Sequence, residues 1–423
     1  MLTAITGINW GDEGKGRMVD LLSQSYDVVV RYQGGNNAGH TVINAQGKFV
    51  LNLLPSGILR PSLVNVMGSG MVIDPAHLLK ETANLREKGV AVGPQNLKIS
   101  DRAALCLPVH PLLDTLEEDR LAGSAQGSTR RGIAPAYADK YLRKVLRMGD
   151  LLELEAVKDR AQDYIHYKNL AVQQMYGGTP PTFDEIWAAL NTWAEALAPY
   201  ICDTGLYLEA AADAGKDILF EAQLGALRDI DFGIYPYCSS SHTVAAYAPI
   251  GAGVPGRRLD GSIGVTKAYS TCVGGGPFVT EFFGAEAETL RQAGGEFGAA
   301  TGRPRRVGAF DVVASRYGCR LQGPTSIALT MLDVLSYRDE IPVCIAYEID
   351  GEVTTAFPYG SRLERAKPVL KTFGGWKKDI TGVRKKEDLP PEARAYVAFI
   401  EESLGCPISQ VSVGPQREAY IPF

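Results

Sequence analysis

The sequence has no run of 18 or more apolar residues, although 45% of its 423 residues are hydrophobic. A helix that spans a bilayer needs about 20 such residues in succession, so no membrane span is expected. The first residues have the pattern of a strand rather than of a signal peptide. A large excess of charge of one sign is also missing, since the chain has 43 Lys and Arg and 48 Asp and Glu. The resulting net charge of −5 argues against a nucleic-acid partner.

Patterns of paired cysteines and clustered histidines are absent too. The seven cysteines are odd in number, widely scattered and contain no C-x-x-C, which is typical of reduced thiols in a cytoplasmic protein. The five histidines are equally scattered, so no zinc site is expected. No Gly/Ser or Pro linker, internal repeat or low-complexity segment divides the chain. We therefore expect a single domain over residues 1–423, long enough for a large core.

The feature around which the chain is organised is the stretch G-I-N-W-G-D-E-G-K-G-R, residues 7–17. It lies between two apolar runs, which predicts a strand, a glycine-rich turn and a helix. Its glycines allow backbone N–H groups to converge on an anion at the start of a helix, and Lys15 adds a full positive charge. A plain turn would not need three glycines, a lysine and two acids together. The stretch therefore predicts a phosphate-binding loop.

This loop departs from a standard P-loop in two ways. Gly16 stands where Ser or Thr would bind magnesium, and Asn9 occupies the first glycine position. Two carboxylates, Asp12 and Glu13, lie inside the loop instead. An acid beside bound phosphates is repelled unless it holds a metal ion or takes a proton, so we expect one of these functions here.

Further strands and polar loops follow in alternation with helices. A β-branched run at 27–32 leads into Q-G-G-N-N-A-G-H-T at 33–41; ligands in open α/β sheets bind at such strand ends, so both early loops should face one cleft. The alternation predicts an α/β fold with a large, mainly parallel central sheet flanked by helices. Expected strands lie at 63–67, 97–100, 217–221, 260–269, 342–350 and 408–412, a hairpin at 41–54, and helices at 74–88, 151–176, 183–214 and 392–404.

Three polar segments are candidates for anion binding. Residues 123–140 predict a long loop with hydroxyls and two arginines, which is either an anion site or a solvated surface loop. Residues 239–243 offer hydroxyl donors suited to a phosphate or a ribose. Arg303, Arg305 and Arg306 lie in G-A-A-T-G-R-P-R-R and form either an oxyanion binder or a basic surface patch.

Motifs along the whole chain resemble those of the adenylosuccinate synthetase family. They are G-D-E-G-K-G, Q-G-G-N-N-A-G-H-T-V, R-G-I-A-P-A-Y-A-D-K, D-I-D-F-G-I-Y-P-Y, V-T-K-A-Y-S-T, A-A-T-G-R-P-R-R, L-D-V-L and V-S-V-G-P-Q-R. The resemblance implies a GTP-dependent ligase that condenses L-aspartate with IMP through a 6-phosphoryl intermediate, giving adenylosuccinate, GDP and phosphate for AMP synthesis. It also implies Mg²⁺, a cytoplasmic homodimer, and a partly P-loop-NTPase-like fold with inserted helical subregions.

The same resemblance implies roles for single residues. Asp12 would be the general base and a magnesium ligand, Lys15 would hold phosphate, and His40 would be the acid that assists phosphoryl transfer. Gly39 would give its carbonyl to magnesium, and Arg143 would reach the acceptor nucleotide from a neighbouring subunit. The implied GTP-binding residues are Gly11, Asp12, Glu13, Gly14, Lys15, Gly16, Arg17, Gly39, His40, Thr41, Arg305, Met331, Leu332, Asp333, Ser412, Val413 and Gly414. The implied acceptor-binding residues are Asp12, Asn37, Thr129, Arg143, Leu224, Ser239 and Arg303. The implied aspartate-binding residues are Ala299, Ala300, Thr301, Gly302, Arg303 and Arg305.

Departures from the family pattern cluster around the acceptor nucleotide. With the register fixed by D-I-D at 229–231, a family glutamine falls on Leu224, a leucine on Arg228, and an arginine on Cys272. Arg228 would then favour an extra oxygen or phosphate near the pocket. Two alternatives follow: the same chemistry on another acceptor, such as GMP, dGMP or a specialised purine, or a local shift that lets Gln223 act as the glutamine. A non-catalytic GTP-binding paralogue is the third alternative, although it would not need Asp12, Lys15 and His40 together.

Overall fold

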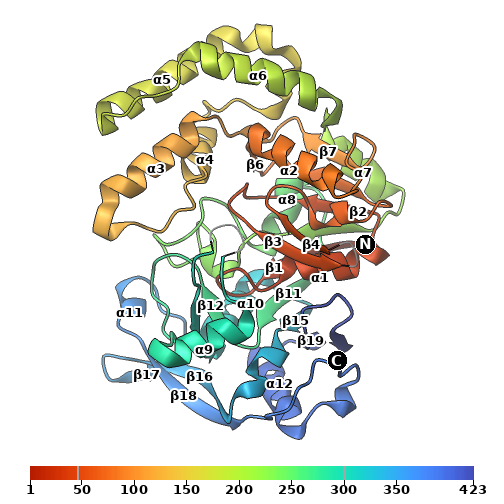
Figure 1. Cartoon of the computed structure of the whole chain (residues 1–423), viewed down its shortest axis with the longest axis vertical. Helices are drawn as coiled ribbons and strands as arrows, with labels where there is room; N and C mark the ends of the chain where they lie inside the picture. The colour runs from red at the N-terminus through yellow and green to blue at the C-terminus, as the bar shows by residue number, and fades with distance from the viewer. Residues whose placement is uncertain (45–46, 299–301) are drawn as a thin grey trace.

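A ten-stranded sheet forms the centre of the computed structural model, which describes residues 1–44, 47–298 and 302–423 (Figure 1). Its strands are β1 (Leu2–Gly7), β2 (Val28–Arg31), β5 (Val64–Met67), β7 (Leu97–Ser100), β9 (Ile201–Cys202), β10 (Ile218–Glu221), β11 (Gly261–Lys267), β15 (Ser326–Thr330), β19 (Ile408–Ser412) and β20 (Tyr420–Pro422). Their order is β20-β19-β15-β11-β1-β10-β2-β5-β7-β9. The strands pair in parallel, with β20 antiparallel at one edge. The predicted mainly parallel sheet is confirmed.

β1 is the central strand, because it pairs with β10 on one side and with β11 on the other. Ile5 lies opposite Glu221 of β10 and opposite Ile263 of β11. The Ile5 and Phe220 side chains are fully buried, as expected for apolar runs in a sheet covered by helices on both faces. The chain thus leaves β1 at the middle of the sheet, where ligands of α/β proteins bind.

Smaller sheets and twelve α-helices surround this centre in the described part of the chain. The remaining strands are β3 (His40–Asn44), β4 (Gly47–Leu51), β6 (Val72–Ile73), β8 (Ala104–Leu105), β12 (Ser270–Cys272), β13 (Arg306–Gly308), β14 (Phe310–Asp311), β16 (Glu340–Ile349), β17 (Glu352–Thr354) and β18 (Lys367–Gly374). The helices are α1 (Lys15–Leu22), α2 (Pro75–Glu87), α3 (Val109–Leu121), α4 (Ile133–Tyr141), α5 (Lys158–Tyr176), α6 (Phe183–Leu197), α7 (Thr204–Asp213), α8 (Ala248–Ala252), α9 (Gly284–Gly294), α10 (Val312–Gln322), α11 (Ser361–Glu364) and α12 (Pro391–Leu404).

Two groups of helices lie at opposite ends of the molecule, with the others between them (Figure 1). α5 and α6 make an outer layer beyond α3 and α4, whereas α9 and α12 lie at the other end with β16 and β18 (Figure 1). Each group has its own apolar core: one includes Leu113, Ile165 and Leu190, and the other includes Val397 and Ile400. No helix in the described ranges is long and apolar enough to cross a membrane.

Three sequence predictions of secondary structure are wrong in part. The predicted loop at 123–140 ends in a helix, α4, because Ile133, Ala136 and Tyr137 share a buried face. The predicted helix at 183–214 is two helices, α6 and α7, with Pro199 and the short strand β9 between them. Pro199 cannot donate a backbone hydrogen bond, so the helix ends there. The helix predicted at 151–176 begins only at residue 158, after a 3₁₀ segment, Met148–Val157.

Other predictions are confirmed. The hairpin pairs β3 with β4 antiparallel, and its turn residues 45–46 lie outside the described ranges. Asp74 caps α2 by accepting from the His77 backbone N–H at 3.0 Å, and Trp193 is buried in the core beside the partly buried Trp187. The seven cysteines are free.

Asp311 gives a test of how α10 is anchored. Its carboxylate is fully buried, accepts from the Ala314 backbone N–H at 2.9 Å, and accepts from the Tyr347 hydroxyl at 2.6 Å. Asp311→Ala should lower the free energy of unfolding by about 1–3 kcal/mol, because a helix cap and a buried hydrogen bond are lost. Denaturant titration at pH 7 measures this change.

The pH dependence separates the charge of Asp311 from its capping role. Burial raises the pKa of Asp311 to about 6, so its contribution to stability is full at low pH and is lost as the pH rises from about 4 to about 6. Asp311→Asn keeps the cap and removes this titration. The variant should therefore gain stability relative to wild type over that pH range, and a constant difference would contradict the assignment.

Candidate functional site

The carboxyl ends of the central strands bring the chemically reactive residues to one edge of the sheet. β10 ends at Glu221, β11 at Lys267, β15 at Thr330 and β19 at Ser412, while β1 leads into the glycine-rich loop. Parallel strands present these ends side by side. The topology alone therefore gathers residues that are up to about 400 positions apart in the sequence.

A cavity of about 900 Å³ opens at this edge. Its walls include the loop after β1, the loop before β3, residues 126–129, residues 235–240, Arg305 and side chains of α3, α4 and α5. The predicted site residues that line it are Gly11, Asp12, Gly14, Lys15, Gly16, Asn37, Gly39, His40, Thr41, Thr129, Leu224, Ser239 and Arg305. The predicted single cleft for the two early loops is present.

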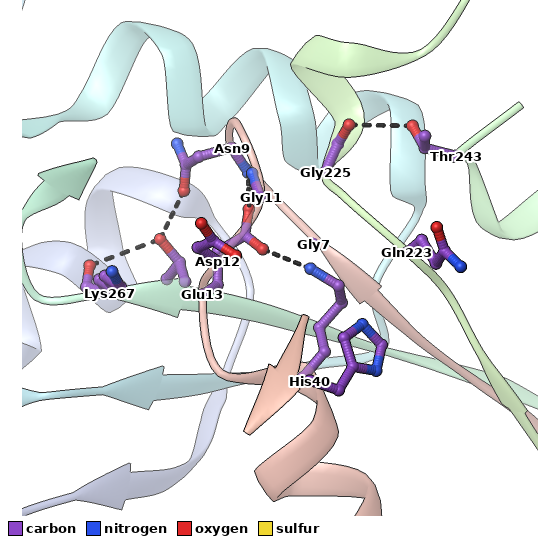
Figure 2. A network of polar contacts seen from close by, with 12 residues as sticks. Gly7, Asn9, Gly11, Asp12, Glu13, His40, Gln223, Gly225, Thr243 and Lys267 are labelled. Carbon is purple, nitrogen blue, oxygen red and sulfur yellow. Dashed lines mark hydrogen bonds and ion pairs between the residues drawn. The ribbon is translucent and has the colours of Figure 1, made fainter. Parts of the chain in front are cut away.

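The loop after β1 closes around an acid of its own. Glu13 is 2% exposed and accepts hydrogen bonds from the backbone N–H groups of Asn9 at 3.2 Å and Gly11 at 2.8 Å (Figure 2). Lys15 donates to its other oxygen at 2.6 Å. The described residues that line the cavity include Lys15 but not Glu13. Glu13 therefore holds the loop together from inside rather than facing the ligand space.

Gly16 has a packing role that accounts for the missing Ser or Thr. A Cβ at this position would lie 2.7 Å from the Cβ of His40, which is closer than real Cβ atoms approach. Glycine therefore lets β3 pack against the first turn of α1. This contact brings His40 to the glycine-rich loop.

Asp12 begins a chain of alternating charges. It adopts a left-handed backbone conformation, with φ of 60°, and its carboxylate lies 3.0 Å from Nε of Arg305 in an ion pair. Arg305 donates to Glu296 at 2.8 Å, and Lys267 donates to the same buried carboxylate at 2.6 Å. Burial would raise the pKa of Glu296, but Lys267 and Arg305 hold it below its ordinary value. This series of ion pairs fixes Arg305 beside Asp12 on the cavity wall.

His40 is paired with a fully buried acid. Its Nδ1 contacts Oε1 of Glu221. The same oxygen accepts from the Ser56 hydroxyl at 2.6 Å, and Oε2 of Glu221 accepts from the Ser56 backbone N–H at 2.7 Å. Burial lowers the pKa of His40, and the Glu221 charge opposes that shift. Hydrogen bonding through Nδ1 leaves Nε2 as the nitrogen that can serve a ligand. Glu221 thus orients the imidazole within the cavity wall.

A second cluster of predicted residues lies away from the cavity lining, around the end of β19. Arg17 donates to the Ser412 hydroxyl at 3.3 Å and also contacts the carbonyl of Gly414. The Ser412 hydroxyl accepts from the Met331 backbone N–H at 3.3 Å. Asp333 follows two residues later in a 3₁₀ segment, Leu332–Tyr337, and burial raises its pKa. The Met331–Ser412 hydrogen bond thus joins the end of β19 to the segment that contains the half-buried Asp333.

Some predicted residues do not meet the cavity in this chain. Arg143 is exposed after α4, and Gly302 and Arg303 are exposed before β13. Residues Ala299, Ala300 and Thr301 lie outside the described ranges. Three residues that the sequence analysis did not assign take part instead: Glu221, Lys267 and Glu296. The only sequence signal for them was an ionisable side chain at or just beyond the end of an apolar strand or a helix.

Leu224, a predicted site residue, lines the cavity. Gln223 is fully buried, and its Nε2 donates to the carbonyl of Gly35 at 2.7 Å. Figure 2 shows its side chain turned away from Asp12. The described lining residues include Leu224 but not Gln223, so the structure does not adopt the alternative in which a local shift brings Gln223 into the pocket.

Comparison with known proteins identifies the relatives of this arrangement. The adenylosuccinate synthetase family model matches residues 4–421. The chain belongs to the adenylosuccinate synthetase family. It is 45% identical to the adenylosuccinate synthetase of Caldanaerobacter subterraneus subsp. tengcongensis, with 99% of this chain and 98% of that protein covered. It is 44% identical to that of Dehalococcoides mccartyi, with 99% of each covered.

Solved structures agree with this membership. The fully ligated adenylosuccinate synthetase of Plasmodium falciparum superposes with a TM-score of 0.94 at 34% identity, covering 100% of this chain and 99% of that one. A cyanophage S-2L succinoaminodeoxyadenylate synthetase, bound to dGMP and dATP, gives a TM-score of 0.60 at 19% identity over 99% and 94%, and shares the fold alone. The chain is thus a GTP-dependent ligase of purine biosynthesis, and neither an altered acceptor nor a non-catalytic role is favoured.

The pairing of His40 with Glu221 can be tested directly. Glu221→Gln should lower the pKa of His40 further, because the neighbouring negative charge that favours the imidazolium is removed while the shape is kept. Turnover should fall by about 10²-fold, the scale of losing one proton-transfer partner. Imidazole NMR titration and steady-state kinetics provide the measurements. An unchanged His40 titration would show that the contact does not control the imidazole.

Proposed function

We propose that the 900 Å³ cavity is the joint site where GTP, IMP and L-aspartate react. The observation that carries this proposal is the convergence of Asp12, Lys15 and His40 on one wall, with Thr129 and Ser239 on the others. Acid, cation and imidazole beside a glycine-rich loop suit phosphoryl transfer, while the hydroxyls suit a nucleotide. These groups suit the reaction of the adenylosuccinate synthetase family, to which the chain belongs.

Asp12 acts as the general base. The 6-oxo group of IMP is a poor leaving group, and its oxygen becomes a better nucleophile when a carboxylate takes the proton from N1. Attack of O6 on the γ-phosphorus of GTP then breaks the bond to the β,γ-bridging oxygen and releases GDP. The amine of aspartate displaces phosphate from C6 of the 6-phosphoryl intermediate. The Arg305 ion pair keeps the Asp12 carboxylate oriented on the cavity wall.

His40 stabilises the phosphoryl group as it is transferred. Its Nδ1 is engaged by Glu221, so Nε2 is the atom that donates to a phosphoryl oxygen when the ring is protonated. Burial lowers the pKa of His40, while approach of the negative γ-phosphate raises it again. Protonation is therefore coupled to the presence of GTP. Lys15, which shares the loop, offsets charge on the same phosphates.

The oxygen donors at the front of the loop fit Mg²⁺. Asp12 is about one-third exposed on the cavity wall, and Gly39 supplies a backbone carbonyl in the same lining; hard oxygen ligands of this kind are the ones magnesium takes. When bound, the ion would neutralise charge on the β- and γ-phosphates. Arg305 offsets the charge of Asp12 before the ion binds and after it leaves.

The remaining parts of the site serve the other substrates. The segment 299–305 suits the two carboxylates of aspartate through Arg303 and Arg305, since guanidinium binds carboxylate in a bidentate manner. Arg143 is exposed outside its own cavity and would serve the acceptor of a neighbouring subunit in a homodimer. Free thiols at all seven cysteines support a cytoplasmic location.

A panel of acceptors tests the proposed function. A coupled assay with GTP and aspartate should show turnover with IMP well above that with dIMP, GMP, dGMP or XMP. Asp12→Ala should reduce IMP turnover by at least about 10²–10⁴-fold, the scale of losing a general base, with the folded state retained. Preferred use of a guanine nucleotide as acceptor, or an Asp12→Ala variant with more than about a tenth of wild-type activity, would overturn the assignment.

Guanine recognition is assigned to Asp333 with the Ser412–Gly414 backbone. A carboxylate can accept from both N1–H and the 2-amino group of guanine, a pair that adenine lacks. Asp333→Ala should therefore raise the KM for GTP by about tenfold or more. The difference between the KM for GTP and the KM for ATP should become smaller. Asp379→Ala, an exposed acid nearby, is the matched control and should leave the GTP preference intact. Equal use of ATP and GTP by wild type would contradict the role.

A further inference from the structure

Two arginines hold the short backbone segment after β12, residues 273–276. Arg228 donates through Nη2 to the carbonyl of Val273 and reaches that of Gly275 at 3.5 Å. Arg306, at the start of β13, donates to the carbonyl of Gly276 at 2.8 Å. Successive carbonyls of this segment are thus met by guanidinium groups from two different elements.

Arg228 also connects this segment to the loop on the opposite side. Its Nη1 contacts the carbonyl of Tyr237, and its Nη2 lies 3.0 Å from Sγ of Cys272. The side chain is 7% exposed, so both terminal nitrogens are engaged by protein acceptors. Arg228 lines the cavity, and its guanidinium binds the walls of the pocket. An extra ligand oxygen or phosphate beside it stays a prediction.

The segments that Arg228 connects are walls of the proposed acceptor site. Val273, Gly274 and residues 235–240 line the cavity. The backbone N–H of Gly275 donates to the carbonyl of Gln126 at 3.2 Å, and Gln126 belongs to the lining segment that leads to Thr129. Displacing Arg228 would loosen three walls at once.

The sequence supports an exchange of side chains between two touching positions. The family pattern has leucine at 228 and arginine at 272, whereas this chain has Arg228 and Cys272, and the two side chains are in contact. We propose that Arg228 is a positioning residue of the acceptor site: it supplies from β10's loop the guanidinium that the family pattern places on β12, and so preserves an IMP pocket. This inference rests on the proposed function of the cavity.

Kinetics of single and exchanged variants test the proposal. Arg228→Leu should raise the KM for IMP by about tenfold or more and leave the KM for GTP within about threefold. Arg228→Leu combined with Cys272→Arg should restore the IMP value to within about threefold of wild type. Arg86→Leu is the matched control, because Arg86 also bonds a carbonyl, that of Val92, in a region remote from the cavity; its IMP kinetics should be unchanged.

Hydrogen exchange gives a readout that does not depend on turnover. In Arg228→Leu, peptides covering 126–129 and 273–276 should exchange faster than in wild type or in Arg86→Leu. Unchanged exchange in Arg228→Leu, unchanged KM for IMP, or a folded double variant that fails to regain IMP affinity would overturn the proposal. If instead the proposed function failed, the wild-type enzyme would not use IMP. Hydrogen exchange in Arg228→Leu would still show whether Arg228 holds the segments 126–129 and 273–276 in place.

Discussion

The buried pair of Glu13 and Lys15 is the interaction on which the site depends. A lysine and a glutamate almost free of solvent contact cannot remain charged unless they are paired and hydrogen bonded, and here the carboxylate meets one ammonium and two backbone N–H groups. This fixes the path of the loop after β1. Asp12 is then held in a left-handed conformation at the cavity surface, next to the acid that faces inward.

The same constraint repeats along the sheet edge. Glu221 is matched by His40 and Ser56, and Glu296 by Lys267 and Arg305. A buried carboxylate without its partner would destabilise the fold by several kcal/mol. These ion pairs therefore fix the relative positions of side chains from strands that are distant in sequence. The consequence is a preorganised wall in which Asp12, Lys15 and His40 line the cavity.

The sequence predicted most strands, the parallel sheet and the loops that meet at its edge, because apolar runs and glycine patterns are local signals. It could not predict that Glu13 faces inward while Asp12 faces outward, since both acids have the same neighbours in the sequence and only the fold separates them. Glu221 and Glu296 went unassigned for the same reason. The sequence predicted a loop in place of α4, because Gly132 and the polar residues before it are typical of loops and the amphipathic helix that follows is short.

The acceptor side shows how a local change need not alter function. Leu224 lines the cavity where the family pattern has a glutamine, and Gln223 holds the Gly35 backbone. If the cavity binds IMP as proposed, an apolar side chain would replace one hydrogen bond to the base edge. An amide lost from a pocket costs most when its partner is left unpaired; water in the cavity would bind that partner. Arg228 donates to the carbonyls of Tyr237 and Val273, and it stands in for the arginine that the family pattern has at 272. Under the proposed function, the positive charge beside the acceptor is therefore relocated rather than added, which is why IMP remains the expected acceptor despite several substitutions around it.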